Sequence, residues 1–175
     1  ALTPAKRDAF TPRDVSNTCW AYATAGFEAP ELFDAMAAAA APRVAEFSPQ
    51  GLVYDRCVSS GRRHHVSSGR PPHRFTCTQA NTAWGFATAG VAAPALFDAI
   101  KGQVVADAAT FDAQALSNVA WALATAGVAG VGEAFEAVAA ASEGRLGEFK
   151  PQEISNLCWS FAKAHVMHGG LFRAV

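Results

Sequence analysis

The histidines and cysteines are the residues of this 175-residue chain that could bind a metal ion. His64, His65 and His73 lie in one stretch, and Cys57 and Cys77 flank it. Protein zinc sites space their ligands as short pairs, such as two cysteines separated by two to four residues. The stretch shows no such pair, so we expect no metal site and no cofactor.

His165 and His168 form a second candidate pair, because a spacing of three residues places both on one face of a helix. We favour a different interpretation, in which His165 replaces a glycine that ends a helix and His168 follows in the loop. No Ser–His–Asp set, paired carboxylates or phosphate-binding glycine loop stands out in the sequence. We therefore expect no catalytic residues and a protein that is not an enzyme.

The chain contains an internal repeat. Its asparagines recur after 37 and 38 residues, and a first block is followed each time by a second one, which predicts tandem helical hairpins. The first blocks are Phe10–Gly26, Phe111–Gly127 and Phe149–His165, and the second blocks are Leu32–Met36, Leu96–Ile100, Ala134–Val138 and Leu171–Val175.

Helix signals bound the two blocks. Thr11 is a suitable N-cap, Pro12 fits the first helical position, and Gly26 suits a left-handed C-cap, so a helix is predicted over about 12–25. A second helix is predicted to begin near Pro30. We predict an all-α protein, an α-solenoid with a right-handed superhelix, in which stacking buries most of each first helix.

Each of the four tryptophans follows an asparagine by three residues. On a helical wheel, Asn17 and Trp20 lie with Arg13 opposite an apolar stripe that contains Val15 and Cys19. We interpret the tryptophans as core and the asparagines as groups that bond the neighbouring repeat's backbone; a base-stacking platform and base contacts are the alternatives. The pairs are Asn17/Trp20, Asn81/Trp84, Asn118/Trp121 and Asn156/Trp159.

The second repeat departs from the period. Asn17 and Asn81 are 64 residues apart, 27 more than the period of 37, and deleting Val53–Gln79 restores the repeat. Valine codons begin with GT and one glutamine codon is CAG, so the segment could be an in-frame retained intron or a gene-model error. A genuine disordered loop is the alternative, and either would be poorly ordered because the segment lacks an apolar period.

The predicted organisation follows from this insert. Residues 1–52 contain the end of a preceding repeat, repeat 1 and the start of repeat 2. A disordered insert spans 53–79, and 80–175 contain the rest of repeat 2, repeat 3 and part of repeat 4. Because both ends interrupt the pattern, we expect a fragment of a longer array.

The repeated pattern F-x-P-Q-x-L-S-N-x-x-W-A-F-A-x-A-G, followed by P-x-L-F-D-A, resembles the octotricopeptide-type repeats and the related helical repeats of RAP and FAST-kinase-like organellar proteins. It is also similar to the helical-repeat domain named for the RNA-editing substrate-binding complex. The resemblance covers the chain except the insert. It implies a scaffold that binds single-stranded RNA in mitochondria or plastids and acts in its processing, stability or translation.

In that picture each repeat faces one nucleotide, which is read by polar side chains of the first helix that differ between repeats. Three repeat positions are candidates, two at the start of the helix and one at its end. The first holds Arg13, Gln50, Gln114 and Gln152, the next holds Asp14, Gly51, Ala115 and Glu153, and the last holds Thr24, Thr88, Thr125 and Lys163.

The charge balance favours a different partner. The net charge is −1, and the chain without Val53–Gln79 would carry −5, whereas an RNA-binding protein is expected to show a basic stripe. The alternative function is therefore a protein–protein interaction solenoid without RNA binding. We expect no membrane span and no small-molecule substrate, because no stretch approaches 20 consecutive strongly apolar residues and no reaction site stands out.

Overall fold

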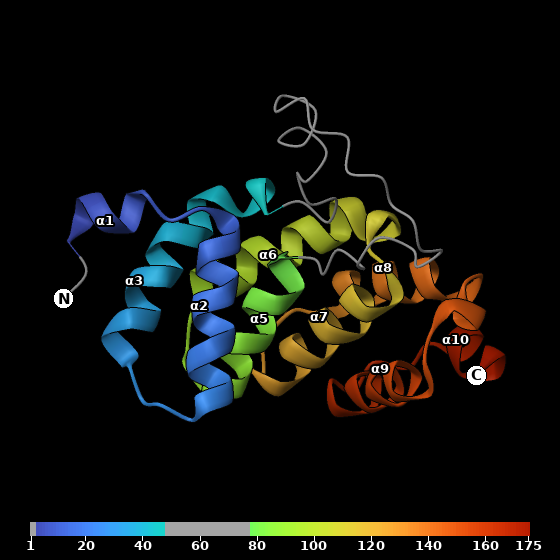
Figure 1. The fold of residues 1–175 in the computed structure, drawn as a ribbon. Helices are drawn as coiled ribbons and strands as arrows, with labels where there is room; N and C mark the ends of the chain where they lie inside the picture. The colour runs from blue at the N-terminus through green and yellow to red at the C-terminus, as the bar shows by residue number, and fades with distance from the viewer. Residues whose placement is uncertain (1–2, 48–77) are drawn as a thin grey trace, which may run out of the picture.

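The computed structural model describes residues 3–47 and 78–175, and these ranges are all-α, with nine helices packed in sequential antiparallel pairs (Figure 1). Three short 3₁₀ turns, η1 to η3, lie between pairs at Ala41–Glu46, Ala108–Thr110 and Leu146–Glu148. The α-helices are α1 (Pro4–Asp8), α2 (Pro12–Ala25), α3 (Pro30–Ala40), α5 (Thr78–Ala89), α6 (Pro94–Asp107), α7 (Ala113–Thr125), α8 (Gly132–Glu143), α9 (Pro151–Lys163) and α10 (Gly169–Ala174).

Local capping explains why α2 spans the predicted residues. The Asp14 amide donates to the Thr11 hydroxyl at 3.2 Å, and the Thr11 amide donates to the Asp14 carboxylate at 3.0 Å. The Thr11 hydroxyl and the Thr11 amide both donate to the Asp14 carboxylate, and these two bonds hold the pKa of Asp14 below its usual value. The helix ends at Gly26, whose φ of +64° is easily adopted by glycine.

The same C-terminal cap recurs along the chain. Gly90 and Gly127 have φ values of +65° and +62° after α5 and α7. His165 takes the equivalent place after α9 with a φ of +56°, and His168 is the N-cap of α10, where its Nδ1 accepts the Leu171 amide at 3.2 Å. The interpretation of His165 as a replaced glycine cap is confirmed.

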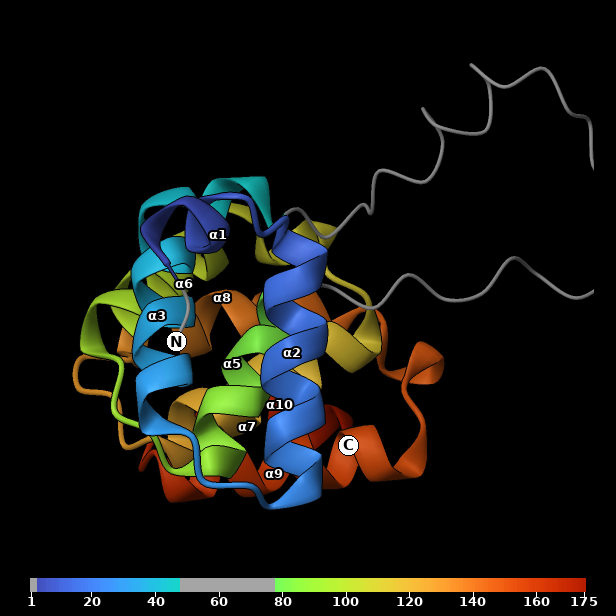
Figure 2. The same cartoon turned by 60° about the vertical axis from the view of Figure 1, so that its left-hand side comes forward.

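The helices form two layers. Helices α2, α5, α7 and α9 pack side by side in that order, and we call them the A layer. Helices α3, α6, α8 and α10 pack in the same order and form the B layer, which lies beside the A layer in Figure 2.

Phenylalanines fill the space between the layers. Phe33 of α3 contacts Phe86 of α5 with ring centroids 5.0 Å apart, and Phe135 of α8 contacts Phe161 of α9 at 4.8 Å, both edge to face. All four rings are buried, and burial of each stabilises the fold by about 1.5–3 kcal/mol. Each contact joins the B helix of one repeat to the A helix of the next.

The extent to which an A helix is buried depends on whether other A helices pack against one or both of its sides. On α7, which lies between α5 and α9, most residues are buried, as predicted. On α2 only Val15, Ser16 and Cys19 are buried, because α5 packs against one side of it and no described helix against the other.

Two arginines at equivalent repeat positions each bond the end of a helical hairpin to its beginning. Arg43 of η1 donates to the backbone carbonyl of Phe10 at 3.1 Å, and Arg145 donates to that of Phe111 at 3.0 Å. Each guanidinium also pairs with a glutamate three residues later, Glu46 or Glu148. The end of a repeat is thus bonded to the start of its own A helix.

The end of the predicted insert needs correction. Residues 53–77 lie outside the described residues, but Thr78 and Gln79 belong to α5, so disorder was wrongly predicted for these two. The buried Gln79 side chain donates to the Val44 carbonyl at 2.9 Å. It occupies the repeat position of Leu116, and its Oε1 has no partner among the described residues.

Candidate nucleic-acid interface

One stripe of the A layer remains accessible. On α7, every residue from Ala113 to Ala124 is buried except Gln114, Asn118 and Trp121, which are partly exposed. These positions lie four and three residues apart, so they share one helix face. Because all other faces of α7 are covered, this stripe points away from the core.

The tryptophans lie on this stripe rather than in the core. Trp20 is 51% exposed and Trp159 is 45% exposed, while Trp84 and Trp121 are partly buried. The prediction of a core tryptophan row was therefore wrong for Trp20 and Trp159, whereas Trp121 packs against the core. It relied on the large apolar indole, whereas the observed placement follows the polar face that Trp20 shares with Asn17 and Arg13.

Neighbouring indoles form a row across the A layer. The centroids of Trp84 and Trp121 are 6.3 Å apart with an interplanar angle of 31°, and those of Trp121 and Trp159 are 6.4 Å apart at 29°. These separations fall in the attractive range for aromatic pairs. The contacts pre-order the rings, and part of each ring remains exposed.

The asparagines lie one helical turn before the tryptophans. Asn17 is exposed, and Asn81, Asn118 and Asn156 are partly exposed. Among the hydrogen bonds between described residues, none joins these side-chain amides to a neighbouring repeat's backbone, so that predicted role was wrong there. An amide with one acceptor and two donors can instead face a ligand.

The structure brings most of the predicted contact residues onto this stripe. Each lies at the same repeat position, four residues before the asparagine or seven residues after it. Thr125 differs, because its hydroxyl is buried without a partner among the described residues, so its predicted contact is unfavourable in this conformation. Gln50 lies outside the described residues, and the exposed or partly exposed members are Arg13, Gln114, Gln152, Thr24, Thr88 and Lys163.

Acidic and basic side chains are distributed differently in the two layers. The A helices and their N-caps carry Arg13, Lys150 and Lys163 against Asp14, Asp112 and Glu153, which is an even balance. The B helices are acidic and expose Glu31, Asp34, Asp98, Asp107, Glu133, Glu136 and Glu143, with Lys101 and Arg173 as their basic residues. The acidity that argues against RNA binding thus belongs mainly to the other layer.

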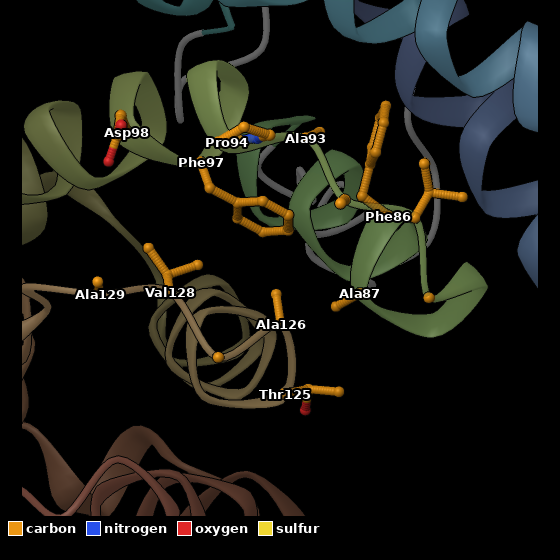
Figure 3. A pocket seen from close by; sticks show the side chains of 14 residues that line it. Phe86, Ala87, Ala93, Pro94, Phe97, Asp98, Thr125, Ala126, Val128 and Ala129 are labelled. Atoms are coloured by element: carbon orange, nitrogen blue, oxygen red, sulfur yellow. The ribbon is translucent and has the colours of Figure 1, made fainter.

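An apolar pocket of about 470 Å³ lies apart from the stripe, at the turns between A and B helices (Figure 3). Phe97 points into it between Pro94 and Val128, and the oxygen of Thr125 is directed away from Phe97. A similar pocket of about 420 Å³ occurs one repeat earlier beside Phe33. The pockets repeat with the turns and do not include the tryptophans.

The described residues contain few candidates for a metal ligand set or a reactive thiol. No group of three or more His, Cys, Asp or Glu residues within 3–47 and 78–175 is placed to hold a metal ion. Burial raises the pKa of the Cys19 thiol to about 12, which keeps it protonated and a poor nucleophile at neutral pH. The stretch around His64, for which no metal site was expected, lies outside the described residues.

Comparison with known proteins finds no family model that matches this chain and no curated protein with significant similarity to it. Within the described part of the chain, no helix has both the length and the apolar character needed to cross a bilayer.

Proposed function

We propose that this protein is an RNA-binding α-solenoid with a right-handed superhelix, and that single-stranded RNA binds along the exposed stripe of the A layer. The exposed tryptophan row carries this proposal. Indole faces stack on every kind of base, and such contacts contribute about 1–3 kcal/mol per base. A row with one indole per repeat offers this contact at regular intervals.

The layered packing supports the solenoid part of the proposal. Each A helix packs on the next A helix, and B helices contact the A helix of the following repeat through Phe33–Phe86 and Phe135–Phe161. Contacts between successive hairpins are the means by which repeat arrays bury a continuous core.

The charge distribution predicts an unusual salt response. Arg13, Lys150 and Lys163 are the basic residues of the A helices and caps, so at most about three phosphates would be neutralised there. For single strands this gives a slope of about −2 for log affinity against log salt. Stacking, rather than phosphate neutralisation, would then dominate affinity.

The test is a titration of the full chain with single-stranded RNA, followed by intrinsic fluorescence. Trp84, Trp121 and Trp159 form the row, and Trp20 holds the equivalent position on α2, so tryptophan emission reports directly on the proposed surface. We expect RNA to quench the emission and Trp159→Ala to weaken binding about tenfold.

Phe27→Ala is the matched control, because Phe27 is an aromatic side chain that is 67% exposed at the turn after α2 and lies off the row. It should leave RNA affinity unchanged. Absence of RNA binding at about 50 mM salt, or equal losses in Phe27→Ala and Trp159→Ala, would contradict the proposal.

The role in organellar RNA processing, stability or translation rests on the resemblance of the repeat and is part of the same proposal. The acidic B layer favours a second candidate function, the docking of a basic protein partner. Asp34, Asp98 and Glu136 occupy the same position in three repeats, and Arg173 occupies it in the fourth. Charge reversal at these residues should abolish binding of such a partner and leave RNA affinity unchanged.

A further inference from the structure

Two A helices carry the same set of polar side chains beside their tryptophan. Helix α7 presents Gln114, Asn118 and Trp121 on its accessible stripe. Helix α9 presents the equivalent Gln152 and Asn156 before Trp159. Each helix therefore places two carboxamides within two turns of an indole.

Carboxamides are selective when two of them face one base. An amide pairs in two-point fashion with an adjacent donor and acceptor on a base edge, as asparagine and glutamine do with N6 and N7 of adenine. Adenine has an amino group with a ring acceptor on both sides, N1 and N7. Cytosine has an acceptor on one side of its amino group only, and guanine has an oxygen in that place.

We infer that α7 and α9 bind two adjacent adenines of a single-stranded RNA, an assignment that rests on the proposed function. Each adenine packs against the exposed part of an indole, and the asparagine and glutamine contact its two edges. Because α7 and α9 are neighbours in the A layer and their indole centroids are 6.4 Å apart, the two bases are consecutive.

Helix α2 provides an internal contrast. It has the same asparagine and tryptophan, Asn17 and Trp20, but Arg13 replaces the glutamine. An arginine donates only, and its common two-point partner is the O6 and N7 pair of guanine. The α2 repeat should therefore prefer guanine, and the glutamine position is the determinant of base choice.

The test compares the affinities of the full chain for RNA oligonucleotides that differ only in two adjacent central bases, AA, CC, UU or GG. We expect AA to bind most tightly, and replacement of either adenine by cytosine to weaken binding about tenfold. The double variant Gln114→Arg/Gln152→Arg should make GG the preferred ligand.

Ala162→Arg is the control for added charge, because Ala162 is exposed on α9 but lies beside the stripe. It should strengthen binding of all four RNAs equally and leave their order unchanged. Both substituted glutamines lie in the first turn at partly exposed or exposed positions, and unchanged helical circular dichroism would verify folding.

The possible failures are distinguishable. Equal affinity for the four RNAs, with quenching intact, would overturn the adenine assignment and leave RNA binding in place. A double variant with the original base order would overturn the role of the glutamine position. Absence of RNA binding would overturn both this inference and the proposed function.

Discussion

Two sets of aromatic side chains recur along this protein and have opposite environments. The phenylalanines between the layers, such as Phe135, are fully buried, whereas the tryptophans on the A layer include Trp159 with 45% of its surface exposed. Both sets form aromatic contacts with a neighbouring repeat. Regular recurrence of an aromatic residue therefore does not distinguish a core position from a binding surface.

Substitution of the two kinds of aromatic residue should give the largest contrast. Phe135→Ala removes a buried ring and leaves a cavity, so it should destabilise the fold by about 3–5 kcal/mol. Trp159→Ala removes a half-exposed ring and should cost about 1 kcal/mol, the scale of one aromatic pair. Chemical denaturation of both variants provides the measurement, and equal losses would contradict the distinction.

For RNA binding, in contrast to stability, the tryptophans should matter more than the buried phenylalanines. The double variant Trp20→Ala/Trp159→Ala removes the two most exposed indoles on the accessible side of the A layer. It should lower RNA-binding free energy by about 2–6 kcal/mol if each indole stacks on one base, measured by anisotropy of a labelled RNA. A loss below about 0.5 kcal/mol would show that the row does not bind bases.

Gln79→Leu sharpens the comparison inside the core. It removes an amide oxygen that is buried without a partner among the described residues, and leucine already occupies the equivalent position, Leu116. The lost bond to Val44 reduces the gain, although the Val44 carbonyl also accepts the Phe47 amide at 3.0 Å. We expect a net stabilisation of about 1 kcal/mol in urea denaturation; destabilisation would show that the Val44 bond dominates.

The smallest expected effect at neutral pH concerns the buried thiol of Cys19. Its pKa is raised to about 12, above its ordinary value, so the unfolded chain loses this proton at a lower pH than the folded protein. The stabilisation is present at neutral pH and is lost between the ordinary thiol pKa and about 12. Cys19→Ala should flatten the fall of stability above the ordinary thiol pKa, and an unchanged pH profile would contradict this.

The parts of the fold that were predicted from the sequence depend on short-range interactions. Thr11, Pro12 and Gly26 each act on their own helix end, so the bounds of α2 could be read from local signals. The exposure of Trp20 depends instead on whether another helix covers its face. The helical wheel correctly placed Trp20 on the polar face of its helix. We nevertheless predicted burial, because the indole is large and apolar.

The residues of the candidate site were likewise predicted from the sequence only in part. Arg13, Gln114 and Gln152 could be selected because they vary at a fixed repeat position, and the structure places them on one stripe. The buried hydroxyl of Thr125 depends on the packing around it, which no repeat position reveals. Likewise, the sequence gives the net charge, but the separation of acidic residues into the B layer needs the arrangement of the helices.

The arginine bonds at the base of the hairpins have a mechanical consequence. Arg43 and Arg145 each tie the end of a hairpin to a carbonyl at its own beginning, and Asp107 occupies this position in the repeat between them. Under tension applied along the packed hairpins, the two hairpins tied by Arg43 and Arg145 should resist extension longer than a hairpin that lacks this arginine. The resistance to extension would then differ from one repeat to the next.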